Sequence, residues 1–336
     1  MALLASLCSL SKQSIFNYKF SVLHVEHGIR PSKESKGDAE FVRAFCKENT
    51  NGVGRIPCRI THIPPGKIAA YAKRKGIGIE AAARHFRYKA LLKTAQILAS
   101  DLSGKTCICI LTAHTKDDVL ELALMRVLRG CGPAGLAAMT VKKEQKIKNK
   151  DQSENKIFIF RPMLDITRSD VIAYLTAKGI SWREDATNSD EQFLRNRVRR
   201  KLIPLLNDTF PFWRKGVSAM AQTQSLAADF IAQEAENRIK WDTYLENSLC
   251  ANAAVFFAQP QIIREEALFQ AADELLKKVK TLRTIKRAAA RRFCEGVVTA
   301  SDLGAVRVRR KGESIILSCG KGDFFEKGVS RLIRHL

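Results

Sequence analysis

Short apolar runs alternate with longer amphipathic stretches along the first two hundred residues. The pattern predicts strands at residues 19–25, 56–63, 107–111 and 157–160. Between them it predicts helices at 38–48, at 78–98, from about 117 onward and at 167–178. This alternation favours an α/β fold with a doubly wound, mainly parallel sheet. The run Cys107-Ile-Cys-Ile-Leu111 has no polar side chain, which is typical of a strand buried on both faces.

The pattern changes near residue 205. Residues 216–241 and 262–293 have helical periodicity, and residues 305–319 alternate around Lys311-Gly312 as a hairpin does. The lysine-rich stretch 141–156 is poor in apolar residues, which predicts a solvated loop. We therefore expect an α/β domain at 1–205, a basic helical second domain at 206–300 and a small β tail at 301–336.

Acidic side chains follow directly after the third predicted strand. Parallel α/β sheets present their ligand crevice at the carboxyl ends of their strands, and His114, Asp117 and Asp118 stand there. A helix that begins near Asp117 places Asp117, Asp118 and Glu121 on one face of its first turn. Three crowded carboxylates need a cation, such as a divalent metal that carries phosphates or an amine substrate. Acids that merely complement the helix dipole are the alternative.

The same predicted helix has an apolar side and a basic end. Leu120, Leu124 and either Val127 or Leu128 form the stripe that should face the core. Arginines near the end of the helix suit its negative pole, and Gly130 suits its termination.

A second unusual segment runs from Trp182 to Arg200. Asp185, Thr187 and Asn188 favour a turn or a helix cap. Four arginines follow within six positions and cannot all share one helix face: Arg195, Arg197, Arg199 and Arg200. A charge cluster of this kind is usually a solvated surface. Beside a phosphate-binding crevice, it would instead supply guanidinium groups for a triphosphate or an RNA backbone.

The composition limits the class of protein. The formal net charge is +23, from 57 Lys and Arg against 34 Asp and Glu, which implies a polyanionic partner such as nucleic acid. Acidic lipid is the competing partner, but no long basic amphipathic helix supports it. No apolar run approaches the roughly 18 residues of a membrane span. Nine cysteines without paired spacing, among them Cys107, Cys109 and Cys319 in apolar segments, predict reduced core thiols of a cytoplasmic protein.

Six short motifs occur in a fixed order across about 200 residues. They are His24-x-x-His27-Gly-Ile-Arg30-Pro31, Glu80-Ala-Ala-Ala-Arg84-x-x-Arg87-Tyr88, Ala113-His114-x-x-Asp117-Asp118-x-x-Glu121, Arg126-x-x-Arg129-Gly130-x-Gly132, Arg161-Pro162, and Glu184-Asp185-x-Thr187-Asn188 through Arg195-Asn196-x-x-Arg199. Together they closely resemble the bacterial tRNA(Ile)-lysidine synthetase family.

The resemblance implies a Rossmann-like ATP-pyrophosphatase fold that uses ATP and Mg²⁺. Its expected partners are L-lysine and a tRNA(Ile) with a CAU anticodon, with no membrane involved, and a homodimer would suit the family. In the implied reaction, the wobble cytidine is adenylated by ATP, and the ε-amine of lysine then displaces AMP to leave lysidine. Such chemistry depends on positioning and charge neutralisation.

The resemblance also implies roles for particular residues. Asp118, Glu121 and Arg195 are the expected catalytic residues, with the two acids recognising lysine. His27, Arg84 and His114 are expected near the nucleotide, although His27 could simply hydrogen-bond at a strand end. Arg87, Arg129 and Arg199 are expected to contact phosphate or tRNA, and Asp117 to bind magnesium or to have a structural role. The basic face of the second domain, including Arg287, Arg291 and Arg292, could be an ordinary solvated surface, but the net charge of the chain favours contact with the acceptor arm or backbone of tRNA.

One family motif is absent. The phosphate-binding loop Ser-Gly-Gly-x-Asp-Ser normally precedes a helix similar to Met1-Ala-Leu-Leu-Ala, so this chain starts where that loop should have ended. Either the true start lies upstream of Met1 or the loop has been lost, and the chain as given is expected to be inactive without it. A non-catalytic tRNA-binding remnant and a related ATP-pyrophosphatase such as a tRNA thiolase are the alternatives.

Overall fold

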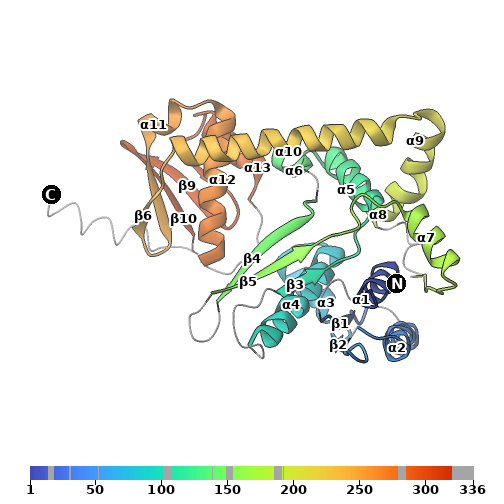
Figure 1. Cartoon of the computed structure of the whole chain (residues 1–336). Coiled ribbons are helices and arrows are strands. Elements are labelled where there is room, and N and C mark those ends of the chain that lie inside the picture. The colour runs from blue at the N-terminus through green and yellow to red at the C-terminus, as the bar shows by residue number, and fades with distance from the viewer. Residues whose placement is uncertain are drawn as a thin grey trace. The chain divides into compact units, whose positions relative to one another are not determined.

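The computed structural model forms two compact units, Met1–Gln222 and Thr223–Leu336 (Figure 1). It describes residues 1–13, 19–29, 32–51, 53–100, 108–137, 139–148, 154–184, 191, 193–278 and 285–319. Several residues singled out above therefore lie outside the described residues: Arg30, Pro31, Cys107, Asp185, Thr187 and Asn188.

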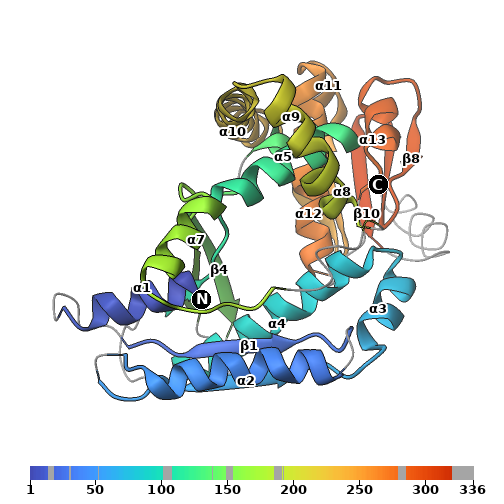
Figure 2. The same cartoon turned by 90° about the vertical axis from the view of Figure 1, so that its right-hand side faces the viewer.

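The first unit has the predicted α/β fold. Strand β1 (Val22–Glu26) pairs in parallel with β2 (Cys58–His62), and β3 (Ile108–Leu111) pairs in parallel with β5 (Glu154–Phe160). The two pairs are separate sheets among the described residues, whereas the sequence pattern predicts one doubly wound sheet. Helix α4 (Ile79–Ser100) contacts β1, β3 and β5 and so connects the two sheets (Figure 2).

The predicted helices of this unit are present, together with others that the pattern did not predict, such as α3 (Lys67–Lys75). The start and end of α3 are fixed by glycines with positive φ, Gly66 and Gly76. The apolar side of α3 packs on α4 through Ile68 and Ala72. The remaining helices of the first unit are α1 (Ala2–Ser11), α2 (Ser32–Glu48), α5 (Lys116–Arg129), α6 (Pro133–Leu136), α7 (Arg168–Ala177), α8 (Leu194–Arg197) and α9 (Ile203–Thr209).

The prediction that β3 is buried on both faces was wrong. Helix α4 covers the face that carries Ile110, Ile157 and Ile159, and these side chains are buried. Cys109 lies on the opposite face of β3 and is exposed, so it is not a core thiol. An uninterrupted apolar run therefore did not guarantee two covered faces, because packing is decided by what lies over each face of the sheet.

The predicted loop at 141–156 is partly a strand. Residues Lys142–Lys148 form β4, which pairs antiparallel with β5 and lies at the edge of the three-stranded sheet. The charges do not prevent this, because an edge strand needs backbone hydrogen bonds on one side only and tolerates solvated lysines. Lys142 also places its ammonium 4.1 Å from the centre of the Phe158 ring.

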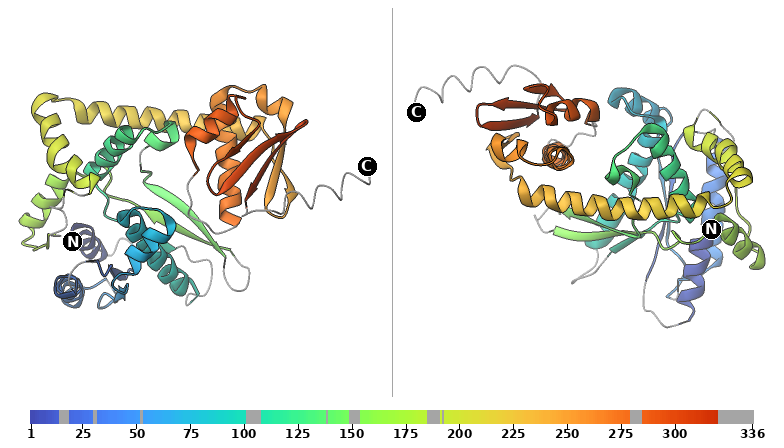
Figure 3. Two further views of the ribbon diagram at one scale, coloured as in Figure 1. Left: turned by 180° about the vertical axis from the view of Figure 1, so that it is seen from behind. Right: turned by 90° about the horizontal axis from the view of Figure 1, so that it is seen from above.

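The second unit is a five-stranded antiparallel sheet with helices (Figure 3, orange and red ribbons). Its strands are β6 (Asp242–Leu245), β7 (Ser248–Asn252), β8 (Ala300–Asp302), β9 (Val306–Lys311) and β10 (Ser314–Cys319), in the order β6-β7-β10-β9-β8. The helices are α11 (Ala253–Phe257), α12 (Gln261–Lys278) and α13 (Arg287–Cys294). Helix α10 (Trp213–Arg238) spans the boundary between the two units.

The predicted hairpin around Gly312 is confirmed as β9 and β10. Two strands, β6 and β7, lie inside the stretch 206–300 that was predicted to be helical, and β7 pairs with β10. The hairpin therefore belongs to the same sheet and core as the preceding residues, through Leu249, Val308 and Leu317. The proposed domain limits at 205 and 300 stay predictions. Among the described residues, no helix combines the length and apolar character needed to cross a membrane.

Candidate functional site

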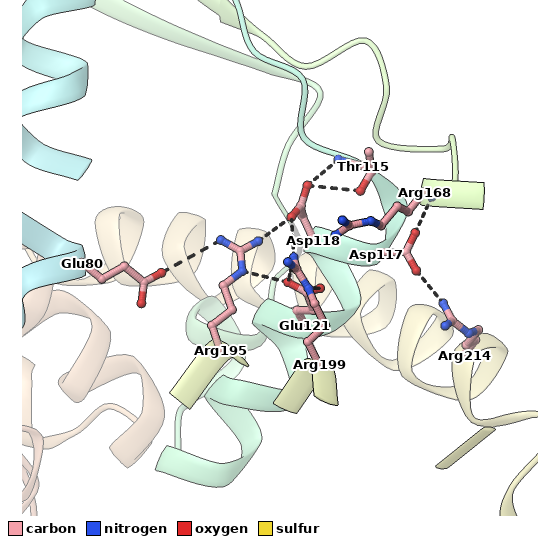
Figure 4. Close-up of polar contacts among 9 residues, drawn as sticks. All are labelled: Glu80, Thr115, Asp117, Asp118, Glu121, Arg168, Arg195, Arg199 and Arg214. Carbon is pink, nitrogen blue, oxygen red and sulfur yellow. Dashed lines mark hydrogen bonds and ion pairs between the residues drawn. The ribbon is translucent and has the colours of Figure 1, made fainter. Parts of the chain in front are cut away.

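The candidate site is built around the first turn of α5. The backbone N–H of Thr115 and its hydroxyl both donate to Asp118 Oδ2, at 2.8 and 3.2 Å. This contact fixes the start of the helix directly after β3, because the Asp118 carboxylate satisfies a backbone donor that the helix itself leaves open. Asp118 therefore uses one oxygen to cap the helix and presents Oδ1 to neighbouring elements (Figure 4).

Two arginines from α8 and the turn that follows it reach these acids (Figure 4). Arg195 donates through Nε to Glu121 Oε2 at 2.8 Å and through Nη2 to Asp118 Oδ1 at 2.5 Å. Arg199 grips Glu121 with two bonds, from Nε to Oε1 at 2.6 Å and from Nη2 to Oε2 at 2.9 Å. We call these four residues the carboxylate–arginine cluster. The paired bonds from Arg199 to both oxygens of Glu121 are bidentate, which is a strong form of charged hydrogen bond.

Burial makes this cluster a single electrostatic unit. The Glu121 side chain is only 2% exposed, so its charge depends on the two guanidinium groups rather than on water. Burial by itself would lower the pKa of Arg195, but the hydrogen bond and charge of Glu121, together with the charge of Asp118, outweigh burial and raise it. The two carboxylates therefore stabilise the positive charge of Arg195, and the cations that the crowded carboxylates require are arginines of the same chain.

Asp117 does not belong to this cluster. Its Oδ2 accepts from the backbone N–H of Arg168 at 2.7 Å, and its Oδ1 accepts from Arg214 Nη1 at 2.9 Å (Figure 4). Burial would raise the pKa of Asp117, but these hydrogen bonds lower it. The expectation that the three acids of α5 share one face was wrong. Asp117 is bound from α7 and α10, whereas Asp118 and Glu121 are bound from α8 and the turn that follows it.

The apolar side of α5 also differs from the prediction. Leu120 and Leu124 pack with Val198 and Trp213 as expected, and Met125 joins them. Val127 and Leu128 are instead 50% and 59% exposed.

The carboxylates offer little to a resident magnesium ion. Among the described residues, no three histidine, cysteine, aspartate or glutamate side chains lie together in a way that could hold a metal. Both oxygens of Asp117 accept from donors of the chain, so as it stands Asp117 does not fit a metal ligand. Binding would require Asp117 to release Arg214 or the Arg168 amide.

The backbone after α8 explains why only two of the four arginines reach the acids. A π-helical turn, Val198–Leu202, follows α8 and leads into α9. Pro204 has no N–H to donate to the carbonyl four residues earlier, and the wider turn lies at that point. Arg195 and Arg199 share one face, whereas Arg197 and Arg200 are exposed. This agrees with the expectation that at least one of the four arginines is solvated.

A cavity of about 280 Å³ adjoins the cluster through Arg195. Its walls come from the end of β1, the start of α4 and residues 193–196, with Val25, Ile79 and Phe193 as apolar parts. Its polar lining residues are His24, Glu26, His27, Ser35, Glu80, Arg87, Arg195 and Asn196. A partly apolar cavity with several convergent polar groups is the usual form of a small-molecule site.

His27 and Arg87 meet across this cavity. Arg87 donates through Nε and Nη2 to His27 Nε2, at 3.3 and 3.1 Å, although the residues are 60 positions apart. Glu26, the neighbour of His27, forms an ion pair with His62 of β2. Glu80 Oε1 lies 4.0 Å from Arg195 Nη1, which brings the first turn of α4 to the edge of the carboxylate–arginine cluster (Figure 4).

His114 is held in its neutral form. Its Nδ1 lies 3.0 Å from Thr112 Oγ1. Burial and the positive charges of Arg84, Arg161 and Arg195 lower the pKa of His114 to about 4, against the opposing effect of Asp118. Arg161 is itself buried and donates through Nη1 to the carbonyl of Thr140 at 2.8 Å. An arginine fixed in this way provides a constant positive charge beside the histidine.

Arg84 and Arg129 also lie outside the carboxylate–arginine cluster. Arg84 stacks its guanidinium 5.0 Å from the centre of the Tyr88 ring, and its charge reaches His114 and Arg87. Arg129 is exposed at the other end of α5, about 17 Å along the helix axis from Asp118. The structure thus gathers Asp118, Glu121, Arg195 and Arg199, with His27 and Arg87 lining the adjoining cavity, but leaves Arg129 apart.

Sequence reasoning missed three polar residues of the site. Glu26 and Glu80 line the cavity, and Arg214 binds Asp117. Glu26 and Glu80 lie within or beside quoted motifs, so their position was a usable signal. Arg214 follows an ordinary helical pattern far along the chain, and no local signal identifies it.

Comparison with known proteins gives consistent results. The family model described as PP-loop domain matches residues 1–206. The chain is 36% identical to a tRNA(Ile)-lysidine synthase of Treponema denticola over 258 residues, which cover 76% of this chain and 50% of that protein. It is 30% identical to a tRNA(Ile)-lysidine synthase of Thermus thermophilus over 298 residues, which cover 88% of this chain and 51% of that protein. The chain thus spans about half the length of these curated relatives.

Among solved structures, a U34-tRNA thiolase of Methanococcus maripaludis, described with its [4Fe-4S] cluster, aligns with a TM-score of 0.47 and 15% identity. The alignment covers 67% of this chain and 68% of that chain. A likeness this weak does not favour a thiolase.

The family match covers more than half of the chain, and it contains every residue of the carboxylate–arginine cluster and of the cavity. The resemblance carried by the six ordered motifs is confirmed by the named relatives. The chain therefore belongs to the PP-loop domain family and is similar to bacterial tRNA(Ile)-lysidine synthases.

Proposed function

We propose that this protein joins L-lysine to the wobble cytidine of a tRNA(Ile) with a CAU anticodon, with ATP as the activating substrate. The names of its relatives support a PP-loop enzyme that modifies tRNA. The observation that carries the proposal furthest is the convergence of Asp118 and Glu121 with Arg195 and Arg199 beside a cavity lined by His27 and Arg87. Such a site places acidic and basic groups within reach of one another, as a reaction with an anionic and a cationic substrate requires.

The proposed reaction has two balanced steps. In the first, O2 of the cytidine attacks the α-phosphorus of ATP, the O2–P bond forms, and the bond to the β-phosphate breaks with release of pyrophosphate. In the second, the ε-amine of lysine, after losing a proton, attacks C2 of the activated base. The C2–O2 bond then breaks and AMP leaves. Both steps depend on positioning and on neutralising phosphate charge rather than on covalent catalysis by a side chain.

The arginines are suited to the phosphate part of this reaction. Arg195 lies at the boundary between the cluster and the cavity, and Asp118 and Glu121 fix the plane of its guanidinium. A fixed donor needs no reorganisation when negative charge develops nearby, which is the main advantage of preorganised electrostatics. Arg87, held by His27, is the second fixed guanidinium at the cavity. Arg199 supports the first by binding the other oxygen of Glu121.

Recognition of lysine by the acids requires a rearrangement. Asp118 Oδ1 and both oxygens of Glu121 accept hydrogen bonds from arginines. A lysine ammonium therefore takes the place of Arg195 Nη2 at Asp118 Oδ1, the more exposed of the two carboxylates. Arg195 keeps its bond from Nε to Glu121 Oε2, so its guanidinium stays in place beside the cavity while Nη2 becomes free for a phosphate oxygen. Glu121 keeps its bond to Arg199, so lysine recognition falls mainly on Asp118.

His114 is suited to hydrogen bonding rather than to proton uptake. With a pKa of about 4 it is neutral at pH 7 and is a weak base. We assign it to orienting the nucleotide or the activated base. Arg84 supports the same region through its charge. The roles of Arg129 in tRNA contact and of Asp117 in magnesium binding stay predictions, as do a homodimer and the contact of Arg287, Arg291 and Arg292 with tRNA. Magnesium usually acts in such reactions by bridging phosphate oxygens.

A transfer assay tests the function directly. The chain is incubated with ATP, labelled lysine and a tRNA(Ile) transcript with a CAU anticodon, and label in RNA and release of pyrophosphate are both measured. We expect label only when all three substrates are present, and none with a transcript whose anticodon cytidine is replaced by uridine. Tight tRNA binding without label or pyrophosphate would instead favour the non-catalytic tRNA-binding alternative. Incorporation of sulfur from a sulfur donor would favour a thiolase.

A further inference from the structure

Helices α3 and α4 hold a layered stack of planar groups that the candidate site does not use. The rings of Tyr71 and His85 lie parallel, with an interplanar angle of 3° and centroids 5.0 Å apart. The guanidinium of Arg74 lies over the ring of Tyr71, 5.4 Å from its centre. Phe86 supports both rings edge-on from below, at 5.2 and 5.6 Å. Tyr71 and Phe86 pack against the core between α3 and α4, and the two helices lie side by side (Figure 2).

Positive side chains adjoin this stack on both helices. Lys75 follows Tyr71 by one turn of α3, and Lys89 follows His85 by one turn of α4. Burial first, and then the charges of Lys89 and Lys75, lower the pKa of His85. Arg74 and Lys89 are exposed. Within the part of the chain that the structure describes, no carboxylate forms an ion pair with Arg74, Lys75 or Lys89. These cations repel one another, so an anion that lies across them would be stabilised.

The surplus charge of the protein is concentrated in the unit that contains this stack. Residues 1–222 hold 38 Lys and Arg against 20 Asp and Glu, whereas residues 223–336 hold 19 against 14. The prediction from composition placed the basic surface in the second domain. The distribution of charge points to the first unit as the main polyanion-binding part.

We propose that Arg74, Lys75 and Lys89, around the Tyr71–His85 stack, form a binding surface for the phosphate backbone of RNA. We call it the α3–α4 basic patch. The inference rests on the proposed function, because the RNA in question is the tRNA substrate. The exposed guanidinium of Arg74, over the Tyr71 ring, offers planar N–H donors that suit the paired oxygens of a phosphate. Stacked aromatic rings beside phosphate-binding cations are a recurrent feature of surfaces that hold single-stranded RNA.

An acidic membrane is a poorer fit to the same patch. A helix that binds a lipid surface presents apolar side chains beside its basic ones. In α3 the apolar residues Ile68 and Ala72 are buried against α4, so the exposed side of α3 is polar. The patch therefore offers charge and planar groups, without an apolar face for insertion.

The test compares two triple variants of the full chain. The patch variant is Arg74→Gln, Lys75→Gln and Lys89→Gln, which keeps good helix formers. The matched control is Lys36→Gln, Arg43→Gln and Lys47→Gln on α2, whose cations lie among the acids Glu34, Asp38 and Glu40. Both variants lose three positive charges. Binding of the CAU tRNA transcript is measured by fluorescence anisotropy from 50 to 300 mM salt, and circular dichroism verifies folding.

We expect the patch variant to bind about tenfold more weakly at 150 mM salt, with the slope of log affinity against log salt reduced by about 2. The control should change affinity by less than about twofold and leave the slope nearly unchanged. A third variant, Arg74→Lys, should keep the slope and lose about twofold in affinity, because charge remains but the planar fork is gone.

The outcomes separate this inference from the proposed function. If the unmodified chain binds no tRNA, both fail. If it binds tRNA but the patch and control variants weaken binding equally, or neither does, the patch inference fails and the proposed function stands. Patch-dependent binding to phosphatidylserine vesicles, with unchanged tRNA binding, would replace RNA by a lipid surface and overturn the inference. A folded patch variant is required for each comparison, and Arg74→Lys provides the milder test if the triple variant does not fold.

Discussion

Two regions of the first unit contain arginines in opposite surroundings. In the carboxylate–arginine cluster, Arg195 and Arg199 are mostly buried and share two carboxylates, so their charge is balanced inside the protein. In the α3–α4 basic patch, Arg74 is exposed on a ring, with Lys75 and Lys89 nearby and no acid in ion-pair range among the described residues. The comparison shows that arginine content alone does not identify an anion-binding surface. What matters is whether the chain itself supplies the counter-charge.

The two regions also differ in what a charged ligand must displace in order to bind. At the patch, an RNA phosphate adds the missing negative charge and displaces only water and counterions. At the cluster, a charged ligand must compete with an existing partner, because every carboxylate oxygen that faces the arginines already accepts a hydrogen bond. The cluster is therefore expected to matter for stability and selective binding, and the patch for affinity and its dependence on salt. Four predictions test this division, in order of expected effect on stability.

The largest effect is expected from Glu121→Gln. This change removes the buried charge that Arg195 and Arg199 share and leaves two guanidinium groups underneutralised. The free energy of unfolding should fall by about 3 kcal/mol. Urea denaturation of both proteins measures it. The control is Glu80→Gln, whose side chain is 53% exposed and 4.0 Å from Arg195, and which should change stability by less than about 0.5 kcal/mol. Equal effects of the two substitutions would remove the distinction between a buried and an exposed carboxylate.

A second prediction concerns the acid dependence of stability through His114. The fold keeps this imidazole neutral, with a pKa of about 4 against an ordinary value near 6.5. As pH falls below 6.5, the unfolded chain takes up a proton that the folded chain does not, so stability falls between pH 6.5 and 4 and this contribution levels off below 4. Partial exposure screens the effect, and we expect about 1 kcal/mol between pH 7 and pH 5. The His114→Gln variant should show a shallower loss in the same urea titration. Parallel curves for the two proteins would contradict the assignment.

Asp117→Asn should have an intermediate effect of about 1 kcal/mol, because it weakens hydrogen bonds to the Arg168 amide and to Arg214 that connect α5 with α7 and α10. The pKa of Asp117 is lowered in the folded chain, so its stabilisation is present above the ordinary aspartate pKa and is lost as pH falls through the lower, folded value. Thermal unfolding at pH 7 and at pH 3 distinguishes this case. The difference between wild type and variant should shrink at pH 3, and a constant difference would indicate that the charge of Asp117 is not involved.

The smallest effect on stability is expected for the patch variant Arg74→Gln, Lys75→Gln and Lys89→Gln. Removing cations that have no carboxylate partner relieves repulsion, so the free energy of unfolding should change by no more than about 0.5 kcal/mol, with a slight gain favoured. Urea denaturation in low and high salt measures it. A loss above 2 kcal/mol would show that the contact of Arg74 with Tyr71 stabilises the fold. The effect of the triple variant on RNA binding would then be judged from the Arg74→Lys variant instead.

Local patterns were sufficient for much of the fold. The strands β1, β2, β3 and β5, the helices α4, α5 and α7, and the hairpin of β9 and β10 all follow from periodicity and from turn or cap residues. Strand β4 was missed because its side chains are charged, and only its backbone pairing with β5 makes it a strand. Strand β7 was missed because it pairs with β10, 62 to 70 positions later, and a short strand of this kind has no distinctive local pattern. Strand β6 pairs with β7 and was missed with it.

The sequence by itself determined the membership in the PP-loop family, the acids at the end of β3, and the large positive charge. These properties depend only on residue types and on their spacing along the sequence, so they can be identified without a structure. Tertiary structure alone decided that Glu121 is neutralised by Arg195 and Arg199, and that Asp117 turns instead to Arg214. It also left Arg74, Lys75 and Lys89 without a counter-charge among the described residues. Pairings between residues 74 to 97 positions apart depend on which helices pack together, and packing is set by the whole apolar pattern rather than by either partner.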